Sequence, residues 1–246
     1  MNTLELIHLQ HILANKVITK DVLPKIVNSI CGVDASYKEG KVRCAAIILE
    51  SKRKKVVESS TSSLKDSAPY IPGFFMLKES KPILHTLKKL KKNFDVLLVD
   101  GNGQLHPRYC GLACYIGLVL DKPVIGVAKK LLCGKVQSDS KVNHDGKIVG
   151  YEIKQGKKKI YVSVGHKISL RTAVKIVKEL ILDNNWYPEP LRLADLNSKF
   201  KWKFLEITEV FSLVCLKKNP ILLQASQMSY SLVILNVSKL SLYCLS

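Results

Sequence analysis

The stretch Asp95-Val-Leu-Leu-Val-Asp100 decides the fold, because Val96–Val99 is an apolar run of the kind that a strand buried on both faces requires. A second such run is Val124–Val127, and the stretch Arg108–Leu120 between the two runs is long enough for a helix. Parallel neighbouring strands need a crossover of this kind. This part of the chain therefore predicts a strand-helix-strand unit at the centre of a sheet.

The residues before this unit predict more strands. The runs Ile30–Tyr37, Val42–Leu49 and Lys54–Ser59 are apolar or β-branched and are separated by turn-like segments, which is typical of an antiparallel meander. Leu4–Val17 carries apolar residues at helical spacing and predicts an opening helix. Ser67–Gly73 contains two prolines and a glycine, so we expect a loop there.

The remaining elements complete a mixed sheet. Ser80 is expected to cap one helix and Ser169 another, and Ile148–Ile153 with Ile160–Val164 predicts a hairpin. The order of elements predicts an α/β fold in which a mixed sheet is flanked by helices, the arrangement of ribonuclease-H-like proteins, although other α/β folds remain open. We expect a single domain over residues 1–203 and an extension of unknown role over residues 204–246.

Composition favours a polyanionic partner. The chain has 39 Lys and Arg against 20 Asp and Glu, a formal net charge of +19, which is the pattern expected of a protein that binds nucleic acid. A genome that favours lysine codons would produce the same excess. The seven cysteines form no metal-binding or disulfide pattern, and residues 1–10 lack the pattern of a signal peptide. We therefore expect a cytoplasmic protein without a membrane span.

Two aspartates occupy places where a charge is costly. Asp34 lies inside an otherwise apolar strand, and Asp100 ends the strand that decides the fold, just before Gly101-Asn-Gly103. A carboxylate in such a place needs a partner, a hydrogen bond or a metal ion. Carboxylate oxygens suit Mg²⁺, and a Mg²⁺ site in a basic protein suggests phosphodiester hydrolysis. A turn-forming role or a Lys or Arg partner remains open for each. Glu79 alone is compatible with an ordinary helix start.

Several spaced motifs together resemble the endonuclease V family, and they occur in that family's order over roughly residues 9–197. The matching stretches are Gly32-Val-Asp-Ala-Ser-Tyr37, Pro69-Tyr-Ile-Pro-Gly-Phe74 with Lys78-Glu79, Val99-Asp-Gly-Asn-Gly103, His106-Pro-Arg108, Ile125-Gly-Val-Ala-Lys-Lys130, Val164-Gly-His-Lys-Ile-Ser-Leu170 and Pro188-Glu-Pro-Leu-Arg-Leu-Ala-Asp195. The resemblance implies a ribonuclease-H-like endonuclease of DNA repair. Such an enzyme recognises inosine and cleaves the second phosphodiester bond on its 3′ side, leaving 5′-phosphate ends.

The resemblance also implies roles for individual residues. Asp34, Glu79 and Asp100 match the family's metal-binding catalytic carboxylates, and Asp195 matches a further residue that completes the metal site. Mg²⁺ is the expected cofactor, and Mn²⁺ is expected to substitute for it. Two further residues match family positions near the scissile phosphate, and we expect them to be catalytic: His106 and Lys129.

A second set of residues is expected to contact nucleic acid. Tyr70 matches a wedge residue that would stack beside the displaced base, and its loop contributes Pro69, Ile71 and Gly73. The pocket for the base is expected to include small residues and one leucine, namely Gly101, Gly103, Gly111, Gly126 and Leu77. His166 is assigned to a loop that faces phosphate.

Three substrate hypotheses follow from this resemblance. The main one is a monomeric enzyme that acts on deoxyinosine in DNA, because the Leu132-Cys-Gly134 continuation resembles the prokaryotic members. An alternative is an endoribonuclease that acts on inosine in single-stranded RNA. A protein that binds inosine without cleaving is less favoured, because none of the three carboxylates is missing.

Overall fold

The computed structural model describes residues 2–66, 69, 71–183 and 185–199. Its helices are α1 (Thr3–Asn15), α2 (Phe75–Leu87), α3 (Leu112–Leu120) and α4 (Leu170–Leu180), and residues 189–199 are also helical. Its strands are β1 (Ser29–Lys38), β2 (Lys41–Glu50), β3 (Val56–Lys65), β4 (Val96–Asp100), β5 (Val124–Ala128), β6 (Lys135–Val136), β7 (Lys141–His144), β8 (Lys147–Gln155) and β9 (Lys158–His166).

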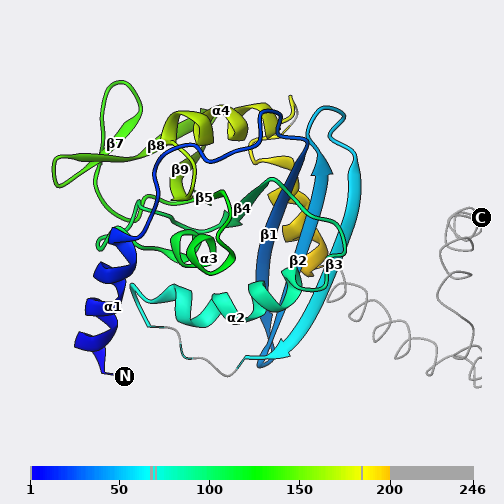
Figure 1. Ribbon diagram of the computed structural model, residues 1–246, viewed down its shortest axis with the longest axis horizontal. Helices are drawn as coiled ribbons and strands as arrows, with labels where there is room; N and C mark the ends of the chain where they lie inside the picture. The colour runs from blue at the N-terminus through cyan, green and yellow to red at the C-terminus, as the bar shows by residue number, and fades with distance from the viewer. Residues whose placement is uncertain (1, 67–68, 70, 184, 200–246) are drawn as a thin grey trace, which may run out of the picture. The chain divides into compact units, whose positions relative to one another are not determined.

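All these strands belong to one mixed sheet in the order β3-β2-β1-β4-β5-β9-β8-β7-β6 (Figure 1). β1, β4 and β5 run parallel to one another, and the other pairings are antiparallel. The helix α3 connects β4 to β5, so the predicted strand-helix-strand unit is confirmed at the centre of the sheet. The predicted meander and the later hairpin are confirmed as well.

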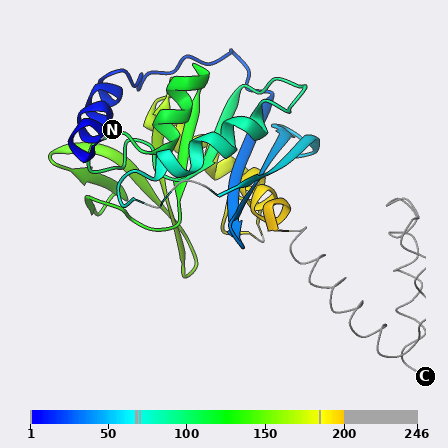
Figure 2. The same cartoon turned by 90° about the horizontal axis from the view of Figure 1, so that it is seen from below.

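Alternating residues of the central strands supply a core on each face of the sheet. Val96 and Leu98 pack with the apolar side of α4, whereas Leu97 and Val99 pack under α2 and α3. Figure 1 shows α4 on one side of the sheet and α2 and α3 on the other, and Figure 2 shows α1 beside them. Helices on both faces explain why β4 reads as a continuous apolar run. The predicted mixed sheet flanked by helices is confirmed.

The predicted start of α2 at Ser80 is wrong. The helix begins at Phe75, directly after the turn that ends at Gly73, and Ser80 lies in its interior. A proline is favoured in the first turn of a helix, so Pro82 is compatible with a helix that starts at Ser80. In the structure Pro82 lies within the helix. Glu79 is consequently a buried residue of the helix and does not mark its start.

Two other predicted element boundaries also differ from those in the structure. α3 begins at Leu112, not Arg108, because Gly111 donates its N–H to Gly103 O and holds the preceding residues in a loop. β3 continues to Lys65, beyond the predicted Ser59, because its polar residues pair along β2 at the sheet edge. The short strands β6 and β7 were not predicted, since neither carries an apolar run.

The predicted boundary between residues 203 and 204 lies outside the described residues, so it stays a prediction. Among the helices that the structure describes, none has both the length and the apolar character needed to cross a membrane.

Candidate metal and nucleic-acid site

The strand register brings Asp34 and Asp100 together. Val33 of β1 pairs with Val99 of β4 in parallel, so the next residue of each strand is an aspartate at the same level. Asp34 is 9% exposed, and its Oδ1 accepts a hydrogen bond from the backbone N–H of Ala35 at 2.8 Å. Both aspartates line a cavity of about 720 Å³, which we call the carboxylate cavity. This placement is compatible with the predicted role of both aspartates in one metal site, which stays a prediction.

Two more carboxylates reach the carboxylate cavity from helices. Glu79 is 5% exposed and comes from α2, whereas Asp195 comes from the helical residues 189–199. That last helix approaches β1 closely at Gly32, where an added Cβ would lie 2.4 Å from the carbonyl carbon of Pro190. A glycine is therefore needed at this point of β1 for Asp195 to reach the cavity.

The electrostatics of the carboxylate cavity are those of crowded anions. Burial, together with the charge of Asp100 and a hydrogen bond to Asp195, raises the pKa of Asp34 to about 8. Burial and the charge of Asp34 raise the pKa of Glu79 to about 8. Burial opposes ionisation of Asp195, but hydrogen bonds from Lys199 and Asp34 hold its pKa below the usual value. The raised pKa of Asp34 and the lowered pKa of Asp195 favour a protonated Asp34 that donates to an ionised Asp195.

Lys129 supplies positive charge within this group. Its Nζ lies 2.6 Å from Asp100 Oδ2 and 4.8 Å from the centre of the Tyr187 ring. Burial acts to lower the pKa of Lys129, but the contact with Asp100 outweighs it and leaves that pKa raised. A charged lysine at the end of β5 therefore faces the carboxylates from the neighbouring strand.

The chemistry of the donor set fits a hard divalent cation. Four carboxylates from two strands and two helices face one cavity, and oxygen ligands of this type suit Mg²⁺ or Mn²⁺. Within the described residues, no three His, Cys, Asp or Glu side chains lie close enough together to hold an ion as they stand. Ligation would therefore require side-chain rotation.

A second cavity, which we call the base pocket after the role that the sequence resemblance implies for it, adjoins the first. It measures about 210 Å³, and it is lined by Gly111, which was predicted as a pocket residue, and by Gly73 of the predicted wedge loop. The other residues around it were not predicted as pocket residues, and they are Gln10, Phe75, Met76, Asn102, His106, Leu112 and Leu132. Phe75, Asn102 and Leu132 line the carboxylate cavity too, so the two spaces meet at these side chains.

Gln10 joins α1 to the base pocket. It is 1% exposed, and its Nε2 donates to Gly73 O at 3.2 Å and to Cys110 O at 3.0 Å. Arg108 donates to the Gln10 side-chain oxygen and also to Gly73 O at 2.7 Å. The opening helix therefore holds the loop that ends at Gly73.

His106 lies in the base pocket and does not line the carboxylate cavity. Its Nδ1 accepts from the backbone N–H of Arg108 at 3.1 Å, so its Nε2 carries the proton and donates to Gly73 O at 3.2 Å. Burial lowers the pKa of His106 to about 4, and the charge of Arg108 adds to this effect. At neutral pH this histidine is an uncharged contact to the loop.

The remaining predicted pocket glycines, Gly101, Gly103 and Gly126, do not line the base pocket. Gly101 lines the carboxylate cavity. At Gly103 and Gly126 an added Cβ would lie 2.1 Å from Val164 O and 2.5 Å from Gly103 N, so both positions allow close backbone packing. Leu77 lines a separate cavity near the β2–β3 hairpin and not the base pocket.

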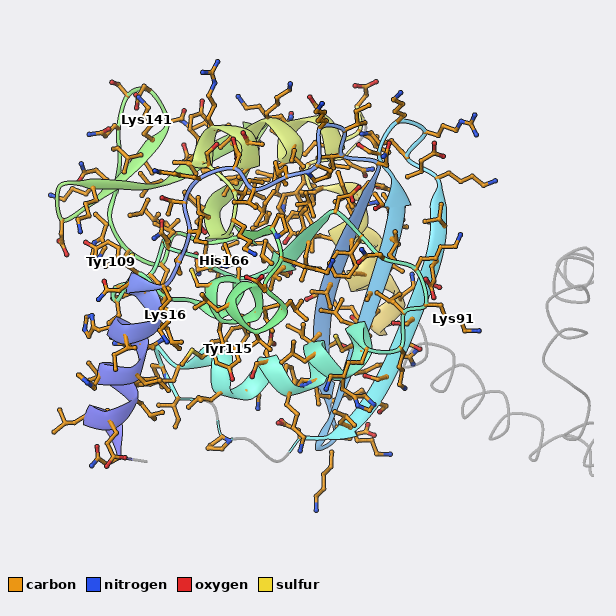
Figure 3. The ribbon with its side chains drawn as sticks, in the orientation of Figure 1. Lys16, Lys91, Tyr109, Tyr115, Lys141 and His166 are labelled. Atoms are coloured by element: carbon orange, nitrogen blue, oxygen red, sulfur yellow. The ribbon has the colours of Figure 1, made fainter. Side chains whose placement is uncertain are left out.

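The structure does not bring His166 to either cavity. Its side chain is 3% exposed at the end of β9, beside α3 (Figure 3), and its Nδ1 accepts from the backbone N–H of Ile18 at 3.2 Å. Pro69 is exposed and Ile71 is partly buried in the loop before α2. Tyr70 lies outside the described residues.

Comparison with known proteins is consistent with the sequence resemblance. The family model described as Endonuclease V matches residues 11–196. The Endonuclease V of Thermofilum pendens is 43% identical over 190 residues, which are 75% of this chain and 82% of that protein.

Solved structures agree with this match. The structure of Endonuclease V from Bacillus subtilis superposes with a TM-score of 0.76 and 29% identity, covering 85% of this chain and 95% of that one. That of Ciona intestinalis, in complex with a 24mer DNA containing an inosine followed by a ribo-adenosine, superposes with a TM-score of 0.74 and 28% identity. This match covers 82% of this chain and 97% of that one.

Proposed function

Since the chain belongs to the endonuclease V family and is therefore a hydrolytic nuclease, we propose that it recognises deoxyinosine in DNA. It cleaves the second phosphodiester bond on the 3′ side of the lesion, as a step of DNA repair. The Ciona intestinalis relative was solved with inosine-containing DNA, which supports this choice of substrate. The observation that carries the proposal is the junction of the base pocket with the carboxylate cavity at Phe75, Asn102 and Leu132.

Asn102 gives the base pocket a means of recognition. Its side-chain oxygen is buried and has no hydrogen-bond partner within the described residues. A buried acceptor without a partner is costly, and an incoming donor would remove that cost. The N1–H of hypoxanthine is such a donor, whereas the corresponding nitrogen of adenine is an acceptor. The Asn102 oxygen therefore favours inosine over adenosine.

The loop before α2 completes the proposed recognition. Tyr70, flanked by Pro69 and Ile71, fills the gap that the extruded base leaves, and aromatic stacking contributes roughly 1–3 kcal/mol per base. Gly73 anchors this loop through its carbonyl, which accepts from Gln10, His106 and Arg108.

Asp34, Glu79, Asp100 and Asp195 are the residues that would hold Mg²⁺, with Mn²⁺ able to substitute. A bound Mg²⁺ would supply the activation of water and the stabilisation of the leaving 3′ oxygen. Lys129 lines the same cavity as these carboxylates. In the proposed reaction its ammonium group moves away from Asp100 and donates a hydrogen bond to the scissile phosphate. We propose a monomer that acts in the cytoplasm.

The test is a cleavage assay on single strands that carry one deoxyinosine, with matched deoxyadenosine and deoxyguanosine strands. Mg²⁺, Mn²⁺ and EDTA are compared, and the products are mapped to the nucleotide. We expect one cut, two bonds 3′ to the deoxyinosine, that EDTA abolishes and Asp100→Asn removes without loss of binding. Asp183→Asn is the matched control, because Asp183 is exposed and lines neither cavity.

Each other outcome has a distinct meaning. Equal cleavage of the three strands would exclude the proposed base specificity. Faster cleavage of RNA strands with one inosine would favour the endoribonuclease alternative. Retention of binding without any cleavage in Mg²⁺ or Mn²⁺ would favour a non-catalytic inosine-binding protein.

A further inference from the structure

Another cavity continues from the carboxylate cavity and is strongly basic. It measures about 490 Å³, and we call it the cationic groove. Five lysines, two aromatic residues and a leucine line it, from the end of β5, the β8–β9 hairpin and the segment before residue 189: Lys129, Lys130, Leu131, Lys157, Lys158, Lys159, Tyr161 and Trp186.

The three cavities form a series. The base pocket and the carboxylate cavity share Phe75, Asn102 and Leu132. The carboxylate cavity and the cationic groove share Lys129, Lys130 and Leu131, whereas the base pocket and the groove share no lining residue. The carboxylates therefore lie between the base pocket and the cationic groove.

The charge of the groove is only partly neutralised by the protein itself. Lys159 contacts Glu152 at 3.3 Å, and Lys154 contacts the same carboxylate at 3.2 Å. Lys157 and Lys158 remain exposed at the hairpin turn, and Lys158 Nζ lies 5.4 Å from the centre of the Trp186 ring. Trp186 is partly exposed, so the groove offers ammonium groups beside an aromatic face. Phosphates and stacked bases have this complementary chemistry.

We propose that the cationic groove binds the substrate strand on the 3′ side of the scissile bond. This inference rests on the proposed function, in which the cut lies 3′ to the base held in the pocket. A strand that passes from the base pocket across the carboxylates continues in the 3′ direction and enters the groove next. Lys130, Lys157 and Lys158 contact its phosphates, and Trp186 stacks with a base.

The test uses deoxyinosine strands with one fixed 5′ flank and 3′ flanks of increasing length, starting from the shortest that is cleaved. For the native protein kcat/KM rises with the length of the 3′ flank. The double variant Lys157→Ala, Lys158→Ala loses this rise. On long 3′ flanks its kcat/KM is expected to be lower than that of the native protein by on the order of tenfold, and the two values converge as the flank shortens. A plot of the logarithm of the binding constant against the logarithm of the salt concentration also becomes less steep. Its slope changes by about 0.7 for each phosphate that a lysine no longer neutralises.

Matched variants separate this effect from a general loss of charge. The double variant Lys52→Ala, Lys55→Ala removes two exposed lysines from the β2–β3 turn, which lines neither the carboxylate cavity nor the groove, and is expected to keep the native dependence. Lengthening the 5′ flank is expected to affect the native protein and the groove variant alike. The inference is overturned if the groove variant keeps the native 3′ dependence, or if the β2–β3 variant loses it equally. Absence of inosine-specific cleavage in the native protein would instead overturn the proposed function.

Discussion

Lys129 Nζ and Asp100 Oδ2 lie 2.6 Å apart, at the ends of the neighbouring parallel strands β5 and β4. The ammonium of Lys129 is therefore hydrogen-bonded to one of the carboxylates that are proposed to hold the metal ion. We expect Lys129→Met to lower the single-turnover cleavage rate by about 100-fold or more, because a preorganised cation for the developing charge is lost. Lys135→Met, in the exposed strand β6, is the control. A near-native rate for Lys129→Met would remove this lysine from the reaction.

The raised pKa values of the buried carboxylates predict how stability depends on pH when EDTA is present. The folded-state pKa of Asp34 and of Glu79 is about 8, against ordinary values of 3.8 and 4.5. Between these limits the folded protein binds more protons than the unfolded chain, so the contribution of these groups to stability is lost as pH rises.

The expected result is a free energy of unfolding that falls between about pH 5 and about pH 8.5, with a smaller fall in Asp34→Asn. Denaturant unfolding of both proteins in EDTA measures the difference, and Asp183→Asn controls for net charge. Parallel profiles of the native protein and Asp34→Asn would show that Asp34 is not protonated in the folded state.

Gln10 is expected to stabilise the base pocket from α1. Gln10→Ala leaves Cys110 O and Gly73 O with fewer donors, so we expect a loss of about 1–3 kcal/mol in the free energy of unfolding. KM for the deoxyinosine strand should rise, because the loop at Gly73 is held less firmly. His11→Ala, exposed on the same helix, is expected to change neither quantity. An unchanged KM with reduced stability would limit Gln10 to a structural role.

Asn102→Leu separates recognition from folding, because the two effects have opposite signs. Removing a buried acceptor without a partner is expected to leave the stability unchanged or to raise it by about 1 kcal/mol. Discrimination between deoxyinosine and deoxyadenosine strands should fall, since the acceptor for N1–H is gone. Competition cleavage and thermal unfolding measure the two effects. Unchanged discrimination would exclude Asn102 from base recognition.

The sequence predicted the central strands and their aspartates because these depend on local patterns. An apolar run that ends in an aspartate marks both a buried strand and a charge that needs a partner, as at Asp100. Asp34 differs in that it lies inside β1, where the surrounding apolar residues mark it as a charge that needs a partner. The pairing of Val33 with Val99 depends on the parallel register of β1 and β4, which no local pattern specifies.

What the sequence could not supply is long-range geometry. Gln10 contacts residues 63 and 100 positions away, and a glutamine in an amphipathic helix carries no local sign of such contacts. Glu79 resembles a helix start because Pro82 follows it, whereas the packing of α2 under the sheet buries it. Trp186 and the β8–β9 lysines meet only after the sheet has formed. The motif that ends at Asp195 predicts a place in the metal site, which stays a prediction, and the approach of its helix to Gly32 becomes visible only in three dimensions.

The close approach at Gly32 also has a consequence for biosynthesis. The residue that admits the last helix lies near the beginning of the chain, whereas Asp195 lies near the end of the described part. A ribosome translates Asp34, Glu79 and Asp100 long before Asp195. An emerging polypeptide that has already formed β1, β4 and β5 therefore still lacks its fourth carboxylate. The four carboxylates of the carboxylate cavity can therefore come together only after residue 195 has been translated.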